Sequence, residues 1–429
     1  MKRIYSFLLL FLLLVTPFAV NAQRSKGDEP HRTLLIPYPT ETLAKEHSMA
    51  RQRYMQPIDE WVDVDGVLRG EFTFPFSWLE RQIFIRIEGV NQPYEVFVNN
   101  KRAGGSTNGF AATEFNITKI SKEDKNRVEL RLTGDEDVAK IECFEHGAPR
   151  PIAYIISQPR VRVRDVAWRA NIDVGVVNAD FSVVMENETL GRKISRLSYE
   201  LYLNDTIRLD AGFRDVELGM YGVDTMRFGA PVPDSVLWSS SNPSMVTLCL
   251  KNRIEGRDVE FYNFAVGLRK LEYKEGRFFI NNKACDIEWC ELSPRTTLAD
   301  LDKLYSGGVR AVRFTAGWVK DEILDYCDAK GIYVAVTAPI NSSLSGESRK
   351  RSGNPSNDPA WRKEYTRRVV QMIHTTKRHP SIIAYYLADD SANGICLYES
   401  YLSAKEITSV PVFYDDGGKE WNSDNREFR

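Results

Sequence analysis

The feature that most constrains the fold is an alternation of strand and helix patterns in the last third of the chain. Four short apolar, β-branched runs alternate with four helical segments: the runs are 309–314, 332–339, 382–387 and 411–414, and the helical segments are 297–307, 319–330, 358–377 and 397–406. Strands separated by helices of this length predict a parallel sheet, and we expect a (β/α) barrel of TIM type. A complete barrel needs about 250 residues and eight strands. Since only ~145 residues follow position 284, enough for about five strands, the sequence predicts a partial barrel.

The region before the barrel has the pattern of β-sandwiches. Short stretches there alternate apolar and polar side chains, as half-buried strands do; the candidates are 70–75, 82–89, 94–99, 127–133, 161–168, 181–187 and 197–204. The dipeptide Asn99-Asn100 suits a hairpin turn, because Asn tolerates positive φ. We therefore expect two sandwiches, at 31–160 and 161–270, followed by the partial barrel at 271–429.

The first residues have the pattern of a secretory signal peptide. Lys2 and Arg3 precede the apolar run Ile4–Val15, and Val20-Asn21-Ala22 supplies small residues for cleavage. We expect removal of 1–22 and export of the mature chain to the periplasm or out of the cell. The apolar run is too short to span a bilayer, so no membrane attachment is expected after cleavage.

Composition argues against several classes of partner and site. The formal net charge is −2, so the chain has neither the basic field of a nucleic-acid-binding protein nor a polybasic membrane patch. Six cysteines are too sparse for a disulfide scaffold; Cys285 and Cys290 could pair, and buried free thiols are the alternative. The five histidines lack Cys or acidic neighbours at ligand spacing. We expect no metal and no cofactor.

The segment 377–394, KRHPSIIAYYLADDSANG, combines a strand pattern with two acidic residues. Its apolar run follows a His-Pro helix stop and leads to Asp389 and Asp390, at the strand end where barrel enzymes place their catalytic groups. The segment resembles the acid/base strand of glycoside hydrolase family 2, the β-galactosidase and β-glucuronidase family, whose pattern reads HPSII-x-W-S-L-G-N-E-S-G. Ala388, Asp389 and Asp390 stand where that family has Gly, Asn and Glu.

Two further segments resemble the same family. Residues 72–118, which begin FTFPFSWL and end EFNIT, follow the order of landmarks in its N-terminal sugar-binding jelly roll. Residues 237–252, LWSSSNPSMVTLCLKN, resemble the L-W-S-x-x-N-P-x-x-Y-x-L signature of its immunoglobulin-like middle domain. The resemblance implies a jelly-roll sandwich, an immunoglobulin-like β-sandwich and a partial (β/α) barrel over the three ranges given above.

The resemblance also implies the chemistry of a retaining β-glycosidase, which needs two carboxyl groups about 5–5.5 Å apart. By position, Asp390 is the acid/base, and Asp389 replaces the Asn that hydrogen-bonds the sugar 2-hydroxyl. The family's nucleophile lies on the seventh barrel strand; here Glu420 is a remaining carboxylate, in a segment without a strand pattern. Where the family reads R-T-S-H-Y-P, this chain keeps Arg313 and ends the segment with Trp318, and both are candidates for substrate binding.

Core-forming parts of the family pattern persist, while pocket-forming parts change. After its first barrel strand the family has a segment rich in Asn, Arg and His, whereas this chain reads Cys285–Glu291. At Asp390, the shorter acid displaces the carboxyl group by about 1 Å, which costs on the order of a hundredfold in rate.

The sequence leaves three hypotheses open. The chain is an exported glycoside hydrolase of β-galactosidase type with weak or no activity, a non-catalytic carbohydrate-binding or complex-forming protein, or a fragment of a longer enzyme. The expected partner is a β-linked glycan or oligosaccharide, and a second subunit is a candidate to complete the barrel.

Overall fold

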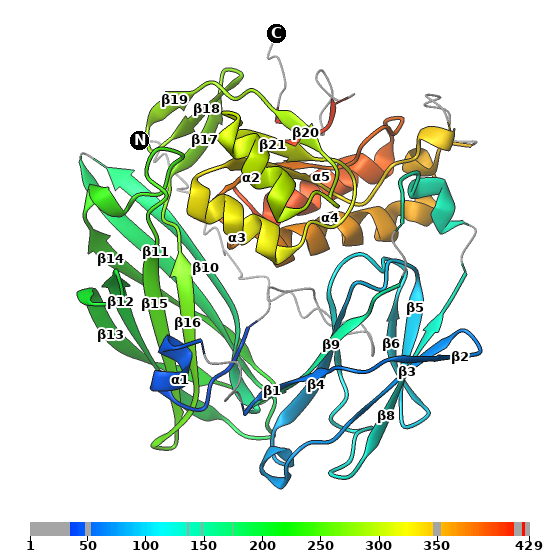
Figure 1. Cartoon of the computed structure of the whole chain (residues 1–429). Coiled ribbons are helices and arrows are strands. Elements are labelled where there is room, and N and C mark those ends of the chain that lie inside the picture. Colours follow the sequence, from blue (N-terminus) through cyan, green and yellow to red (C-terminus); the bar gives the residue numbers. More distant parts are fainter. Residues whose placement is uncertain are drawn as a thin grey trace, which may run out of the picture.

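The computed structural model describes residues 35–47, 53–134, 137–146, 149–173, 175–345, 353–415 and 423–424. The predicted signal peptide, 1–22, and Glu420 lie outside these residues. The described elements form two antiparallel sandwiches and one α/β unit, which lies above the first sandwich and beside the second in Figure 1. None of the described helices has the length and apolarity needed to cross a bilayer.

The N-terminal sandwich is a jelly roll of two antiparallel sheets. One sheet has the order β1 (Met55–Ile58), β9 (Ile152–Gln158), β4 (Gln82–Glu88) and β7 (Thr113–Asn116), and the other β2 (Val62–Val64), β3 (Val67–Phe72), β8 (Asn126–Leu132), β5 (Tyr94–Val98) and β6 (Lys101–Ser106). Alternate residues of β5 enter the core, as the period of a strand requires. Asn99 and Asn100 have φ of 51° and 64°, which confirms the predicted hairpin turn.

The second sandwich has the immunoglobulin-like arrangement of two facing sheets. Their orders are β10 (Val161–Asp173), β11 (Val176–Asn187), β14 (Val223–Val232), and β13 (Ile207–Leu218), β12 (Lys193–Leu203), β15 (Val246–Ile254), β16 (Arg257–Val266). Every second side chain of β11 from Val177 to Met185 is buried in the shared core. The short helix α1 (Glu41–Lys45) packs against β16, where Tyr38 pairs with Phe261.

Among the described residues, the α/β unit contains five parallel strands and four covering helices. The strands, in spatial order, are β20 (Cys290–Leu292), β21 (Ala311–Phe314), β22 (Tyr333–Thr337), β23 (Ile382–Tyr386) and β24 (Val412–Phe413). The helices are α2 (Leu298–Ser306), α3 (Asp321–Lys330), α4 (Arg362–Thr376) and α5 (Ile395–Ile407). The predicted partial barrel is confirmed, and α2 begins with a capping box between Thr297 and Asp300.

One detail of the sequence analysis was wrong. Cys290 and Glu291, which the comparison of patterns placed after the first barrel strand, lie within β20. This strand is three residues long, too short to show a strand pattern of its own. The segment Cys285–Glu291 therefore includes the start of the first parallel strand and does not lie wholly after it.

The two faces of the parallel sheet bury different sets of side chains. On one face, β-branched residues such as Val312 and Val334 pack against the helices. On the other face, Tyr333, Tyr386 and Phe413 pack against a small antiparallel sheet of β17 (Leu271–Lys274), β18 (Arg277–Ile280) and β19 (Lys283–Cys285). This second face corresponds to the inside of a closed barrel.

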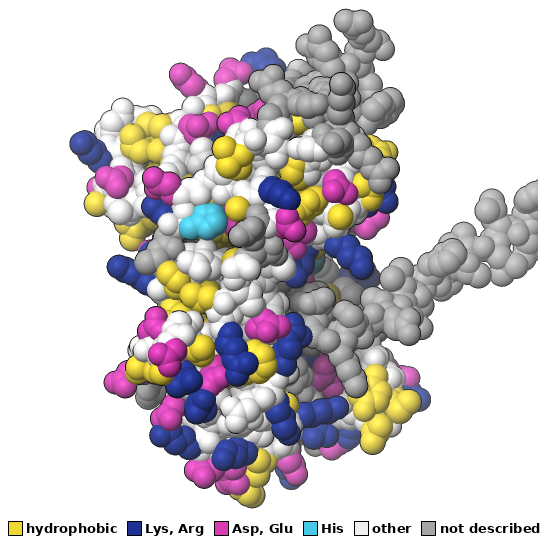
Figure 2. All heavy atoms as spheres, turned by 90° about the vertical axis from the view of Figure 1, so that its right-hand side faces the viewer, with side chains coloured by type: hydrophobic (Ala, Val, Ile, Leu, Met, Phe, Trp, Pro, Cys, Tyr) yellow, Lys and Arg dark blue, Asp and Glu magenta, His cyan; other side chains and the backbone are white. Residues whose placement is uncertain are grey.

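Buried polar contacts join the α/β unit to both sandwiches. The side chain of Arg368 on α4 is fully buried; it pairs with Glu364 at 2.7 Å and with Glu142 of the N-terminal lobe. On the other side, Trp238 Nε1 donates to the carbonyl of Asp328 at 2.9 Å. Figure 2 shows the α/β lobe above the jelly roll, with basic and acidic side chains interspersed over both.

All six cysteines are free. Cys249, Cys327 and Cys396 are buried, while Cys285 and Cys290 are half-buried. Cys285 ends β19 and Cys290 begins β20, so the two thiols belong to different sheets. The suggested Cys285–Cys290 disulfide is not formed; the thiols are free, but the alternative of buried free thiols holds only for Cys249, Cys327 and Cys396.

Candidate functional site

Three charged side chains meet beyond the C-terminal ends of the parallel strands. Arg313 lies on β21, Asp389 follows β23 and Asp415 follows β24. Parallel strands end at one edge of their sheet, so residues from several strands converge there. Arg313 Nη2 lies 3.3 Å from Asp389 Oδ1 and 2.7 Å from Asp415 Oδ2. One guanidinium therefore bridges two carboxylates.

Asp389 is closely confined. Its Oδ2 accepts a hydrogen bond of 2.5 Å from the backbone N–H of Ala316, and its side chain is 15% exposed. Burial raises the pKa of Asp389, and the Ala316 N–H and Arg313 oppose this shift without cancelling it. Burial alone would lower the pKa of Arg313, but Asp415, Tyr386 and Asp389 together outweigh it and the pKa is raised. The cluster thus holds a permanent cation beside a carboxyl group with some affinity for a proton.

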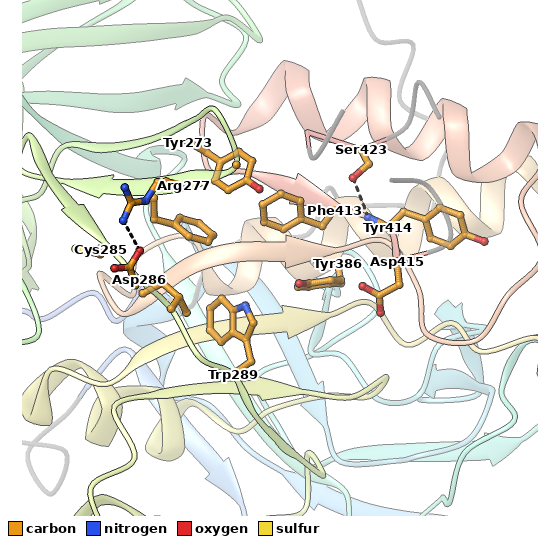
Figure 3. Close-up of a pocket in the computed structure, with 13 residues that line it drawn as sticks. Tyr273, Arg277, Cys285, Asp286, Trp289, Tyr386, Phe413, Tyr414, Asp415 and Ser423 are labelled. Carbon is orange, nitrogen blue, oxygen red and sulfur yellow. Dashed lines mark hydrogen bonds and ion pairs between the residues drawn. The ribbon is translucent and has the colours of Figure 1, made fainter. Parts of the chain in front are cut away.

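A cavity of about 390 Å³ lies between Asp415 of this cluster and the hairpin sheet (Figure 3). Aromatic residues form much of its wall, and they are Tyr273, Phe278, Trp289, Tyr386, Phe413 and Tyr414. Figure 3 shows Asp415 at one side of the cavity and the Arg277–Asp286 ion pair, 2.7 Å long, at the other, while the ring of Tyr414 points away from the other labelled rings. A site of aromatic faces with a few charged groups suits a small ligand that has both apolar faces and polar edges.

Tyr386 changes the shape of this end of the sheet. The family pattern HPSII-x-W-S has Ser at its position, whereas here a ring occupies it that is only 8% exposed. The guanidinium of Arg313 lies 3.9 Å from the centroid of that ring. The aromatic side chain therefore fills space that Ser would leave open, and it holds Arg313 by a cation–π contact.

The four predicted site residues do not form one group. Arg313 and Asp389 meet, but Asp390 has an exposed side chain, and its carbonyl accepts from the N–H of Ser342 at 3.0 Å. Trp318 is half-buried in the loop between β21 and α3. Within the part of the chain that the structure describes, none of the four predicted residues lines the cavity; of the charged cluster, only Asp415 does.

The carboxylates that do approach each other share a single cation. The sum of the two Arg313 distances places Asp389 Oδ1 and Asp415 Oδ2 at most 6.0 Å apart. Retaining glycosidases hold two carboxyl groups about 5–5.5 Å apart on either side of the glycosidic bond. Here Arg313 is bonded to both groups, so a sugar could reach between them only after both ion pairs break.

One group of side chains has the composition of a metal site. Ligand atoms of Asp325, Asp328 and His379 lie within 4.8 Å of one another. His379 Nδ1 is 2.7 Å from Asp328 Oδ2, and Asp328 Oδ1 accepts from the N–H of Ser381 at 3.0 Å. Both oxygens of Asp328 are therefore used inside the fold, and this group has the geometry of a structural histidine–aspartate pair.

The sequence analysis missed three residues of the site: Asp415, Tyr386 and Trp289. Asp415 directly follows the predicted run 411–414, so the rule that selected Asp389 would also have found it. Tyr386 lies in the family-like segment but was not compared with the Ser of the pattern. Trp289 lies just before a strand that the sequence did not predict, and no local pattern placed it near the sheet.

Comparison with known proteins agrees with this architecture. Residues 55–142 match the sugar binding domain of glycosyl hydrolases family 2, and residues 292–424 match the TIM barrel domain of the same family. A β-galactosidase of Psychromonas ingrahamii is 25% identical over 382 residues, which are 83% of this chain and 36% of that protein. A β-galactosidase of Priestia megaterium is 22% identical over 372 residues, 81% of this chain and 36% of the relative. The chain thus spans about a third of the length of these curated relatives.

Solved structures show the same fold. A putative β-galactosidase from Bacteroides fragilis has a TM-score of 0.70 at 18% identity, covering 83% of this chain and 57% of its own. A β-glucuronidase from Bacteroides uniformis has a TM-score of 0.69 at 17% identity, covering 81% and 46%. With two domain models of one family in the expected order, and a barrel sheet whose fourth strand carries the HPSII motif, the chain belongs to glycoside hydrolase family 2.

Proposed function

We propose that this chain is an exported glycan-binding protein that retains little or no glycoside hydrolysis, and that its ligand is a β-linked glycan. The observation that carries the proposal is the bridge of Arg313 between Asp389 and Asp415. It occupies the space between the carboxylates and leaves an aromatic cavity beside them. Such a site can hold a sugar by stacking and hydrogen bonding without cleaving it.

The membership of the family supports a sugar as the ligand. The curated relatives are β-galactosidases, and a structural neighbour, a β-galacturonidase from Eisenbergiella tayi, was solved bound to galacturonate. Export is supported by Lys2, Arg3 and the apolar run that follows them. A second subunit that pairs with β20 or β24 is the candidate to extend the sheet, because these strands are its outer members among the described residues.

Weak hydrolysis is the second candidate, and the raised pKa of Asp389 favours it. A general acid must hold its proton near the working pH, and burial shifts Asp389 in that direction. Asp389 would then act in place of the exposed Asp390. A nucleophile would still be required, and Asp415 could serve only if Arg313 moved away.

The test measures binding and turnover on the same sample. Residues 23–429 are titrated with β-linked oligosaccharides by calorimetry and incubated with a panel of aryl β-glycosides, whose leaving groups need little acid assistance. We expect binding without turnover. Trp289→Ala should weaken binding by about tenfold, since one lost stacking contact is worth about 1.4 kcal/mol.

Trp318→Ala is the matched control, because it removes a half-buried tryptophan of the same lobe that does not line the cavity. It should leave the affinity unchanged. Turnover above a blank without protein would refute the proposal, and its loss in Asp415→Asn, which removes the candidate nucleophile, would establish the second candidate. Equal loss of binding in both tryptophan variants would place the ligand elsewhere.

A further inference from the structure

A larger cleft, of about 1080 Å³, lies at the other end of the parallel sheet. One wall is the outer face of the sheet β10–β11–β14, and the other is formed by the segments that precede β23 and β24. The aromatic cavity lies at the C-terminal ends of the same strands, and the two cavities share no lining residue. The cleft is thus a separate place in the fold.

Basic residues outnumber acidic residues in the lining of the cleft. Seven basic residues line it against two acidic residues, Asp180 and Glu272; the basic residues are Arg169, Arg214, Arg227, Arg269, Lys270, Lys377 and Arg378. The whole chain has a formal net charge of −2, whereas this one cleft has a formal excess of five positive charges. A local excess of positive charge raises the concentration of anions near the cleft, even though the whole chain has a net negative charge.

Internal ion pairs account for only part of this charge. Three of the cations form ion pairs, Lys377 with Asp165, Lys270 with Glu272 and Arg169 with Asp180, and Arg378 also interacts with acidic neighbours within the fold. Arg214 on β13 and Arg227 on β14 are both exposed, and no acidic group among the described residues forms an ion pair with either. These two guanidinium groups are therefore available to a ligand.

The outer face of the sheet contributes both small and charged residues to the cleft. The strand register aligns Ala167, Ser182 and Arg227 in one row, and Arg169, Asp180 and Gly229 in the next. Because Ala167, Ser182 and Gly229 have short side chains or none, they leave space above this face beside Arg227. Arg214 lies on β13 of the facing sheet, and the half-buried Trp168 packs against the sandwich core where the core borders the cleft.

These features define the chemistry of the ligand. Five of the seven cations are arginine, whose planar guanidinium binds carboxylate or sulfate groups through two parallel hydrogen bonds. The volume is at the upper end of the range of about 300–1,000 Å³ for small-molecule sites, so it accommodates several linked units. We propose that this cleft binds an anionic glycan chain that carries carboxylate or sulfate groups on successive sugars.

The choice of a glycan over other polyanions rests on the proposed function. Charge density supports the same choice. DNA carries one negative charge per ~1.7 Å of helix, so a chain with a net negative charge repels it strongly. A glycan with about one charge per sugar meets less repulsion.

The test uses the whole exported chain and labelled oligogalacturonate and heparin oligosaccharides, with affinity measured by fluorescence anisotropy at low salt. Arg214→Gln/Arg227→Gln should weaken binding of the anionic glycan by about tenfold or more, since two charge-assisted contacts are removed. Arg208→Gln/Arg257→Gln is the matched control. It removes the same charge from two exposed arginines of the same sandwich that do not line the cleft, and it should change affinity by less than about twofold.

The two probes distinguish the anionic group: oligogalacturonate reports carboxylate recognition, and heparin reports sulfate recognition. Neutral dextran should not compete. Failure of both anionic probes to bind, or equal loss in the control variant, would overturn the proposal. Equal competition by single-stranded DNA would overturn the glycan assignment.

Trp289→Ala separates this proposal from the proposed function. It should weaken the neutral β-linked ligand and leave the anionic glycan unaffected, because Trp289 does not line the cleft. If Trp289→Ala instead removes binding of the anionic glycan, that ligand occupies the aromatic cavity and the cleft has no such role.

Discussion

His374 makes the stability of the fold sensitive to acid. It lies near the end of α4, and burial lowers the pKa of its imidazole to about 4. Lys377 and Arg164 add to the shift and Asp165 opposes it. In the unfolded chain the same group has its ordinary value near 6.5. The unfolded state therefore takes up a proton at a pH where the native state does not.

The sign and magnitude follow from proton linkage. A histidine whose pKa is depressed in the native state does not lower the unfolding free energy above about pH 6.5. The unfolding free energy then decreases as pH falls toward 4. One pKa unit is worth about 1.4 kcal/mol. The contribution of His374 to unfolding free energy should therefore fall by about 2 kcal/mol at about pH 5 and by about 3 kcal/mol at about pH 4.

The assay is urea unfolding followed by tryptophan fluorescence at several pH values, for the natural chain and His374→Gln. Gln keeps a polar side chain that does not titrate, so the difference in unfolding free energy between the two proteins isolates His374 from other acid-sensitive groups. The unfolding free energy of the natural chain relative to that of His374→Gln should fall by about 2 kcal/mol at about pH 5 and by about 3 kcal/mol at about pH 4. A difference that stays constant within about 0.5 kcal/mol across this range would refute the reasoning.

Three further perturbations have expected outcomes. Burial opposes a raised pKa at His379, but Asp328 raises it above its usual value, so this pair stabilises the fold below about pH 6.5 and loses that stabilisation as pH rises. The melting temperature of the natural chain should therefore fall from pH 6 upward, and this fall should be absent in Asp328→Asn. The same fall in both proteins would contradict the prediction. Arg368→Met leaves buried acidic groups unpaired and should lower unfolding free energy by about 3–5 kcal/mol; a loss below about 1 kcal/mol in urea titration would show that water compensates them. Tyr386→Ser removes a buried ring and should cost about 3 kcal/mol, while a measured cost near zero would show that the ring fills no essential space.

Elements with a local signal could be predicted from the sequence. Thr297 and Asp300 form the capping box at the start of helix α2, and Asn99-Asn100 form the turn of the β5–β6 hairpin. In both cases the decisive interaction joins residues at most three positions apart. Four strands of the parallel sheet followed from their pattern, and the length of the remaining chain predicted about five strands, but the first strand, β20, had no pattern of its own.

The site could be predicted only in part, because its decisive contacts are distant in sequence. Arg313 and Asp389 are 76 residues apart, and their meeting requires the order of the strands. Adjacent acids at a strand end could not be assigned from sequence: Asp389 is confined by the Ala316 N–H, whereas Asp390 is exposed. Trp289 reaches the cavity through the three-residue strand that follows it, and this strand has no pattern of its own.

The first half of the family-like motif has a structural reason to persist that does not involve catalysis. His379 is bound to Asp328, and the N–H of Ser381 donates to the same carboxylate. Pro380 packs so closely on Gly267 that a Cβ at that glycine would lie 2.2 Å from its ring. These contacts tie β23 to α3 and to the immunoglobulin-like sandwich, so their loss would cost stability whether or not the protein acts on sugars. From Tyr386 onward the segment departs from the family pattern at Tyr386, Ala388, Asp389 and Asp390. Leu387 and Ala388 are buried in the core and Asp390 is exposed, so of residues 386–390 only Tyr386 lines the cavity. Packing is therefore a sufficient reason for the first half of the resemblance, and the function must be decided at Tyr386, Asp389 and Asp390.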